Sequence, residues 1–231
     1  MNVAIIPARG GSKRIPKKNI RIFHGQPILK YSIDTAKKSG LFDRIIVSTD
    51  NEEIAEIAKN CGADVPFIRP KHLSDDFVTT DEVIEHSLNW LKERGEHYKY
   101  SCTIYATAPF LQARFLNEAY DRLKESSAVK AFSATSSSFP AQRMFKITKS
   151  GRCRMFSPEH YLTRSQDLES SYHDAGQFYW SAIGCKPDDV MFGGNSIPII
   201  LPRYLVQDID TEEDWINAEI MYKVIKDNKM L

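Results

Sequence analysis

The segment Asn2–Pro7, NVAIIP, runs directly into the loop ARGGSKRIPKKN at residues 8–19. A short apolar run that ends in proline is typical of a strand buried on both faces of a parallel sheet. The adjacent Gly10 and Gly11 let the backbone approach a ligand and turn its N–H groups toward an anion. Because α/β proteins bind ligands at the carboxyl ends of their strands, this junction predicts an anion site at the edge of such a sheet.

Strand and helix patterns alternate through the first half of the chain. Alternation of this kind is typical of a parallel sheet with right-handed crossovers. We therefore expect an α/β fold with a Rossmann-like, mostly parallel sheet flanked by helices. Beyond the first strand, the expected strands are 44–48, 64–68, 101–106 and 128–134, and the expected helices are 26–38, 51–61, 81–94 and 114–125.

The alternation ends near residue 136. Residues 136–172 are rich in Ser, Arg and Pro, with a hairpin expected around 149–151, and we interpret them as a lid or a small β-containing dimerisation arm. The whole chain is interpreted as one domain into which this arm is inserted. The last helix is expected to start at Thr211, where Thr-Glu-Glu-Asp is close to a capping box. Strands are expected again at 177–183 and 197–201.

Composition excludes several classes of protein. The 231 residues include 31 Lys and Arg against 30 Asp and Glu, so no overall field attracts nucleic acid or an anionic membrane. No apolar run reaches the roughly 18 residues that a membrane-spanning helix needs. The 4 cysteines are widely spaced and form no CxxC pair, which favours a reducing compartment. We expect a cytoplasmic protein with neither nucleic acid nor membrane as a partner.

The loop at residues 8–19 combines glycine with clustered positive charge. Arg presents a planar fork to phosphate oxygens, and Lys presents a compact charge. The loop has neither the Walker spacing nor GxGxxG, and a basic run alone is more often exposed surface. Ser12, Asn19 and the two glycines behind a buried strand favour a triphosphate cradle instead. The basic residues of the cradle region are Arg9, Lys13, Arg14, Lys17, Lys18 and Arg21.

The stretch IIPARGGSKRIPKKN resembles the opening motif of the CMP-sugar-acid synthetases, the cytidylyltransferases that act on N-acylneuraminate and its relatives. In that family the motif binds the phosphates of CTP. The resemblance implies catalytic charge stabilisation by Arg9, Lys13 and Lys18, whereas Arg14 and Lys17 lie beside them without an assigned contact. It also implies nucleotide binding by Ala8, Gly10, Gly11, Ser12 and Asn19.

The segment RPKHLSDDFVTT at residues 69–80 resembles the RPxxL segment of the same family, which lines the base and ribose. The resemblance implies nucleotide binding by Arg69, Asp76 and Thr80, and main-chain contacts from Val78 to the base. A second interpretation stays open, in which the segment is a strand exit followed by a helix that Thr79 or Thr80 only caps.

Asp208 and Asp210 lie two residues apart ahead of the last helix. In an extended segment such residues point to the same side, and Mg²⁺ prefers a few carboxylates together with phosphate oxygens and waters. Acidic residues before a helix often only complement its dipole. The sequence QDIDTEED at 207–214 resembles the metal motif of the family, which implies that Asp208 and Asp210 bind Mg²⁺.

Two later segments, TRSQD at 163–167 and YHDAGQFYW at 172–180, are expected to bind the sugar acid. A carboxylate substrate needs a cation or a set of donors, and Arg164 can supply a bidentate contact. Gln166, Gln177 and Tyr179 can orient hydroxyl or amide groups. The aromatic neighbours of Tyr179 are interpreted as core.

The segment YATAPF at 105–110 departs from the neuraminate enzymes, because Tyr105 stands where they have a glutamine that helps to hold the sugar. Together with TRSQD and YHDAGQFYW, it resembles the pseudaminic acid cytidylyltransferases of bacteria. The resemblance implies direct displacement at the α-phosphorus of CTP by the anomeric hydroxyl of a nine-carbon sugar acid, in a homodimer whose arm reaches the neighbouring site. The alternatives are N-acetylneuraminate, legionaminate or a Kdo-like acid as acceptor, a nucleotide-sugar glycosyltransferase, and a non-catalytic nucleotide-binding module.

Overall fold

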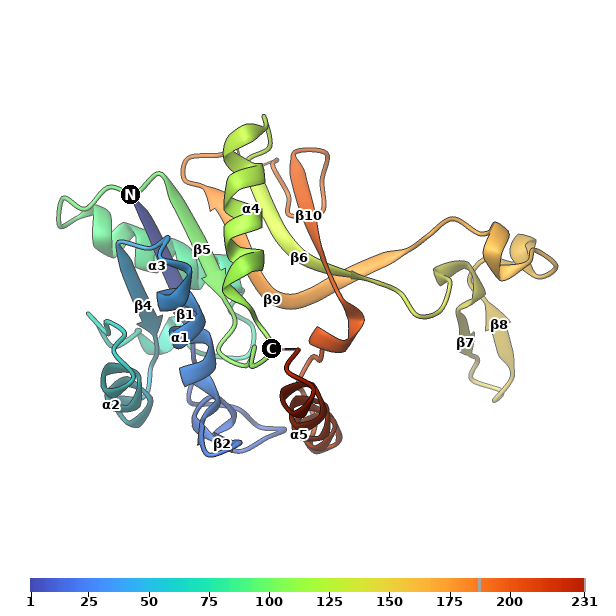
Figure 1. Ribbon diagram of the computed structural model, residues 1–231, viewed down its shortest axis with the longest axis horizontal. Helices are drawn as coiled ribbons and strands as arrows, with labels where there is room; N and C mark the ends of the chain where they lie inside the picture. Colours follow the sequence, from blue (N-terminus) through green and yellow to red (C-terminus); the bar gives the residue numbers. More distant parts are fainter. Residues whose placement is uncertain (187, 231) are drawn as a thin grey trace.

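The computed structural model describes residues 1–186 and 188–230, and a six-stranded sheet forms its centre (Figure 1). The strand order is β10-β6-β9-β5-β1-β4. Only β9 runs antiparallel to its neighbours in this sheet, so the prediction of a mostly parallel sheet is confirmed. The strands are β1 Asn2–Pro7, β4 Arg44–Ser48, β5 Tyr100–Ile104, β6 Lys130–Ser136, β9 Tyr172–Ala182 and β10 Ser196–Leu201.

Helices cover both faces of the sheet, because alternate side chains of a strand point to opposite faces. Val3 and Ile5 of β1 belong to one buried cluster with Leu91 of α3. Ala4 and Ile6 belong to the main core, which also contains side chains of the other four α-helices. Among the described residues, no helix is both long and apolar enough to cross a bilayer. The helices are α1 Ile28–Ser39, α2 Glu52–Asn60, α3 Thr80–Lys92, α4 Ala113–Glu125 and α5 Glu212–Asp227.

The strand expected at 64–68 is wrong. Asp64 forms a single parallel bridge to Ile46, and no strand follows it. Pro66 lies within the expected strand and has no N–H to donate, so a continuous ladder cannot pass through it. The chain instead loops toward the carboxyl end of β4, where the N–H of Arg69 donates to Thr49 O at 2.7 Å.

The helix ends follow the capping signals in the sequence. Asn51 caps α2 by accepting the Ile54 N–H at 3.0 Å, which leaves the neighbouring Asp50 carboxylate available for another contact. Gly40 ends α1 in a left-handed conformation, with φ 67°. Thr211 and Asp214 form the expected capping box of α5, so the backbone just before this helix is held rigidly.

Between β6 and β9 the chain leaves the sheet and projects outward as an arm, residues 137–171 (Figure 1). The arm carries the expected hairpin, with β7 Phe145–Ile147 antiparallel to β8 Cys153–Met155. Gly151 lies in the turn at φ 75°, a conformation that suits glycine. Large apolar side chains on the arm remain exposed, among them Phe139, Phe145, Ile147, Phe156 and Leu162.

Candidate active site

A cavity of about 560 Å³, called here the nucleotide cavity, opens where β1 ends. It is bounded by the first loop, the segment 69–80, the exit of β5 and the segment before α5. These four segments are far apart in sequence and meet only in the fold. The predicted residues that line this cavity are Arg9, Ser12, Lys13, Lys18, Asn19, Arg69, Asp76, Val78, Thr80, Tyr105 and Asp210.

The first loop, residues 8–19, directly contacts the segment that carries Asp208 and Asp210. The Lys18 ammonium donates to Ile209 O at 2.6 Å and lies 3.2 Å from Asp210 Oδ1. The Arg14 guanidinium lies 2.8 Å from Asp210 Oδ2, a contact that the sequence interpretation did not assign. Residues 191 or more positions apart therefore bring cations and a carboxylate to one wall of the nucleotide cavity.

Asp208 lies beside Asp210 but outside the lining of the nucleotide cavity. Partial burial, and then the negative charge of Asp210, raise the pKa of the Asp208 carboxyl. Two carboxylates that repel each other in this way suit a divalent cation. Within residues 1–186 and 188–230, no group of three or more His, Cys, Asp or Glu side chains is arranged to hold a metal ion.

Asp50 fixes the conformation of the glycine loop. Its Oδ1 accepts the Gly10 N–H at 2.9 Å and lies 3.9 Å from Nη2 of Arg69. Arg69 is only 4% exposed, and burial lowers its pKa. A Cβ on Gly10 would lie 3.0 Å from the Asn51 Cβ, so glycine also permits close packing against α2. Arg69 thus acts on the loop through Asp50.

The sequence interpretation assigned Asp50 no role in the site and missed its contact with Gly10. The available signal was its position directly after β4, next to the strand that carries the loop. Asn19 has a comparable supporting role, because its Nδ2 donates to Arg9 O at 2.9 Å. The side chains of Asp50 and Asn19 thus hold the backbone of the first loop, while its cationic side chains line the cavity.

Asp76 is paired with two cations of the first loop. Arg9 Nη1 lies 2.8 Å from Asp76 Oδ1 and donates to Asp75 O at 3.0 Å. Lys13 also pairs with Asp76, and its hydrogen bond is the largest cause of the lowered pKa of that carboxyl. The N–H of Val78 donates to Asp75 Oδ1 at 3.0 Å, which leaves the Val78 carbonyl as the main-chain group for a base.

The two threonines at the start of α3 have different positions. Thr79 is the N-cap and forms a capping box with Glu82. Thr80 is the first helical residue and lines the nucleotide cavity. The capping interpretation therefore applies to Thr79, and the Thr80 side chain remains available to a ligand.

Ala8, Gly10 and Gly11 of the first loop, together with Gln177, are among the predicted residues that lie outside the lining of this cavity. Ala8 is buried and donates its N–H to Ser48 O at 2.9 Å. Gly11 is unhindered, since a Cβ there would meet no atom within 4 Å. Gln177 is 3% exposed and donates from Nε2 to Leu205 O at 2.5 Å. The structure does not bring Gln177 to a surface that a sugar could reach, because its side chain is used to hold the segment that leads to Asp208.

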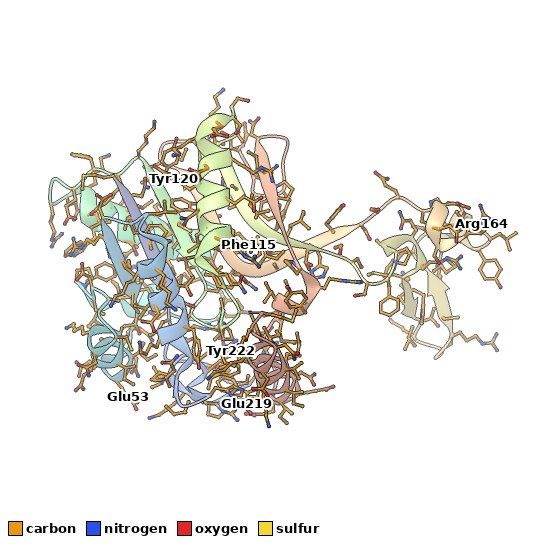
Figure 2. The ribbon with its side chains drawn as sticks, viewed as in Figure 1. Glu53, Phe115, Tyr120, Arg164, Glu219 and Tyr222 are labelled. Atoms are coloured by element: carbon orange, nitrogen blue, oxygen red, sulfur yellow. The ribbon has the colours of Figure 1, made fainter. Side chains whose placement is uncertain are left out.

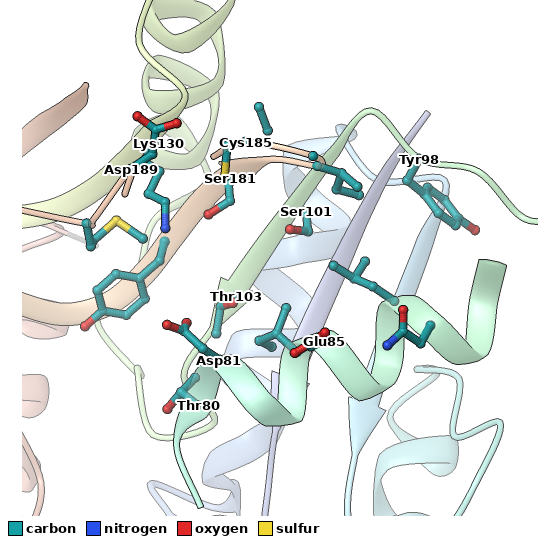
Figure 3. Close-up of a pocket in the computed structure, with 18 of the residues that line it drawn as sticks. Thr80, Asp81, Glu85, Tyr98, Ser101, Thr103, Lys130, Ser181, Cys185 and Asp189 are labelled. Carbon is teal, nitrogen blue, oxygen red and sulfur yellow. The ribbon is translucent and has the colours of Figure 1, made fainter. Parts of the chain in front are cut away.

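A second cavity of about 770 Å³, called here the acceptor cavity, adjoins the first, and Thr80 and Tyr105 line both. In Figure 3, Lys130, Ser181 and Asp189 lie on one side of it, and Thr80, Asp81 and Glu85 on the side of α3. Tyr179 and Asp174 of β9 also line it, with Met191. Of the predicted sugar-binding residues, Tyr105 and Tyr179 are therefore placed together.

Arg164 lies at the far end of the arm, well away from the sheet (Figure 2). Gln166 lies in the short 3-10 helix Ser165–Asp167 that follows it directly. The Arg164 side chain is 71% exposed and pairs with Asp167 at 2.6 Å. Neither residue lines the nucleotide cavity or the acceptor cavity. Within one chain, the structure does not bring the two predicted arm residues to the site.

Comparison with known proteins identifies the family. A family model described as "Cytidylyltransferase" matches residues 3–177. The chain belongs to the cytidylyltransferase family. It is 44% identical over 224 residues to the pseudaminic acid cytidylyltransferase of Campylobacter jejuni, across 96% of this chain and 97% of that relative. It is 30% identical over 220 residues to the N-acylneuraminate cytidylyltransferase of Escherichia coli O18:K1:H7, across 92% of this chain and 50% of that relative.

A solved structure supports the cytidylyltransferase fold independently. The CMP:2-keto-3-deoxy-manno-octonic acid synthetase complexed with CTP superimposes with a TM-score of 0.67 at 14% identity, across 96% of this chain and 98% of that chain. The predicted family, fold class and nucleotidyltransferase activity are thereby confirmed. A glycosyltransferase, one of the alternatives left open by the sequence, is not supported.

Proposed function

We propose that the protein transfers CMP from CTP to the anomeric hydroxyl of pseudaminic acid and releases pyrophosphate. The observation that carries the proposal is the contact between Lys18 and the Ile209–Asp210 segment at 2.6 and 3.2 Å. This contact brings the basic first loop and Asp210 to one cavity. The relative that is 44% identical over almost the whole chain supports pseudaminic acid as the acceptor. We place the reaction in the cytoplasm, where CTP is made.

The cations of the first loop suit the triphosphate of CTP. Arg9, Lys13 and Lys18 line the nucleotide cavity together with Arg14. In direct displacement, the anomeric hydroxyl attacks the α-phosphorus and the bond to pyrophosphate breaks. Fixed positive charge beside the leaving group lowers the barrier because it is already oriented when charge develops. Arg69, Thr80 and the Val78 carbonyl lie where the ribose and base would bind.

Asp208 and Asp210 fit Mg²⁺ by their chemistry. They are neighbouring carboxylates, and the raised pKa of Asp208 reflects their mutual repulsion as well as partial burial. Mg²⁺ is usually held by one or two protein carboxylates while phosphates and waters complete its shell. When bound, the ion would neutralise charge on the phosphates. Lys18 and Arg14 already hold the Asp210 carboxylate against the first loop.

The arm suggests a homodimer. Arg164 and Gln166 lie on the arm and line neither the nucleotide cavity nor the acceptor cavity of their own chain. The exposed apolar side chains of the arm, including Phe145 and Ile147, form the kind of surface that packs against another copy. We propose that the arm of one copy places Arg164 and Gln166 at the acceptor cavity of the other.

The experiment that tests this function is mass spectrometry of the products formed from CTP, Mg²⁺ and each sugar acid of a panel. The panel contains pseudaminic acid, legionaminic acid, N-acetylneuraminic acid and a Kdo-like acid. The expected result is a CMP adduct with pseudaminic acid at the highest kcat/KM. Preference for another acid would reassign the acceptor, and tight CTP binding without any adduct would favour a non-catalytic module.

A further inference from the structure

Strand β9 departs from regular pairing where it faces Ser133 of β6. The register jumps from Phe132–Tyr179 to Ala134–Asp174, so residues 175–178 lie opposite Ser133 alone. The Ser133 hydroxyl accepts the N–H groups of Gln177 and Phe178 at 3.1 and 3.2 Å. A buried side chain thus satisfies donors that the interrupted ladder leaves unpaired, as expected of a stable bulge.

The bulge brings Asp174 and Tyr179 together. In a regular strand, residues five apart point to opposite faces. Here the Tyr179 hydroxyl donates to Asp174 Oδ2 at 2.5 Å. The N–H of Gly176 donates to Asp174 Oδ1 at 2.9 Å, and Gly176 has φ 63°, which favours glycine. Two separate donors therefore fix the direction of one carboxylate.

This carboxylate lies in the acceptor cavity, close to the nucleotide cavity. Asp174 and Tyr179 both line the acceptor cavity. Tyr179 is 9% exposed, and its ring centroid lies 5.3 Å from that of Tyr105, which lines both cavities. Burial, then Tyr105 and Asp174, raise the pKa of Tyr179 far above its usual value, so its hydroxyl stays a donor to Asp174 at any working pH.

The chemistry of a sialic-type acid orients it between the two cavities. Its carboxylate and its reacting hydroxyl share the anomeric carbon, so its negative end must lie by the basic nucleotide cavity. Its acylamino and hydroxyl substituents then extend into the acceptor cavity. An ionised Asp174 can accept about four hydrogen bonds and donate none. Gly176 and Tyr179 use two of these positions, which leaves oxygen lone pairs for a substrate donor.

We propose that Asp174 is a specificity-determining residue that accepts a hydrogen bond from an acylamino N–H or a hydroxyl of the acceptor sugar. This role rests on the proposed function. It adds to the site a residue that the motifs did not single out. Tyr179 acts as a positioning residue, since it holds the carboxylate from the buried side.

The kinetic test compares the parent with Asp174→Asn, which keeps an oxygen acceptor for the Gly176 N–H but loses the charge. The KM for pseudaminic acid should rise about 10- to 100-fold, the loss expected for a hydrogen bond to a charged group, while the KM for CTP stays within about twofold. Tyr179→Phe should raise the same KM by a smaller factor. Asp121→Asn is the matched control, since this exposed aspartate of α4 lines neither the acceptor cavity nor the nucleotide cavity.

Calorimetric titration of pseudaminic acid into parent and variant separates this inference from the proposed function. Weaker binding to Asp174→Asn supports the inference even if no variant turns over. Equal KM and equal affinity in parent and variant would overturn it. An equal rise in the KM for CTP would also overturn it, because it would indicate a general structural effect. If the parent neither binds nor converts pseudaminic acid, both proposals fall.

Discussion

The nucleotide cavity and the acceptor cavity share Tyr105 and Thr80 but are built in different ways. The nucleotide cavity takes most of its cations from one continuous loop that Asp50 and Asn19 hold in place. The acceptor cavity is assembled from α3, β5, β9 and the segment after β9, and its carboxylate at Asp174 depends on a bulge. A phosphate needs charge at one place, whereas recognition of a sugar needs several groups at fixed directions.

The largest effect should follow from breaking the contact between loop and aspartate pair. Lys18→Ala or Asp210→Asn should lower kcat by about 100-fold or more, the usual result of losing one preorganised charge-stabilising group. Pyrophosphate release measures it. Lys17→Ala is the matched control and should stay within about twofold, because Lys17 pairs with Glu53 and does not line the cavity. Near-parent turnover in either main variant would refute the assignment.

The next effect tests whether another copy supplies Arg164 to the acceptor cavity. Arg164→Ala should lower kcat/KM for the sugar acid about 10- to 100-fold, because a charged hydrogen-bonding partner of the carboxylate is lost. Mixing this variant with Lys18→Ala should restore about a quarter of parent turnover, since half of randomly formed dimers then hold one intact site. No recovery on mixing would show that Arg164 does not act across the dimer.

A smaller effect should follow from loosening the loop without touching its cations. Asp50→Ala removes the acceptor of the Gly10 N–H and the partner of Arg69. The KM for CTP should rise about tenfold, the scale of one lost hydrogen bond to a charged group. Asp50→Asn keeps an oxygen acceptor, so the KM for CTP should rise less in this variant. Equal values for parent and Asp50→Ala would mean that the loop does not need this support.

The smallest effect concerns the capping box that holds the backbone of Asp210. Asp214 Oδ2 accepts from Asp210 N and Thr211 N, and the hydrogen bond from the Thr211 hydroxyl is the first cause of its lowered pKa. Thr211→Ala should reduce the free energy of unfolding by about 1 kcal/mol at neutral pH. A lowered pKa stabilises the fold above the ordinary aspartate pKa of about 3.9, and this contribution disappears as pH falls through the folded value.

Urea unfolding at neutral and acidic pH checks this prediction. The difference between parent and Thr211→Ala should shrink in acid, when Asp214 is protonated. A difference that is unchanged between the two conditions would show that the cap does not depend on the charge of Asp214.

Local signals in the sequence account for most of the fold and for the nucleotide cavity. The strand at Asn2–Pro7, the cap at Thr211 and the glycine loop each depend on neighbouring residues, so short patterns predict them. The wrong strand at 64–68 has a local cause as well, since Pro66 interrupts an otherwise suitable run. An apolar pattern alone does not predict a strand here, because it takes no account of the N–H donor that proline lacks.

Long-range contacts limit what the sequence shows of both cavities. The role of Asp50 depends on its distance from a loop forty residues earlier. The meeting of Asp174 and Tyr179 depends on the bulge opposite Ser133, which no period-2 pattern predicts. Gln177 lies in the same motif as both, yet the bulge turns its side chain inward to Leu205. The sequence motif therefore identifies the segment 172–180, but it does not show which of the side chains in that segment line the acceptor cavity.

A crystal structure of the complex with CTP and Mg²⁺ tests the central claim most directly. We expect the triphosphate against the first loop, within hydrogen-bonding distance of Lys18, and the metal on Asp208 and Asp210. We also expect that the acceptor cavity beyond Tyr105 stays open for the sugar. CTP bound elsewhere, or a metal held without either aspartate, would contradict the claim.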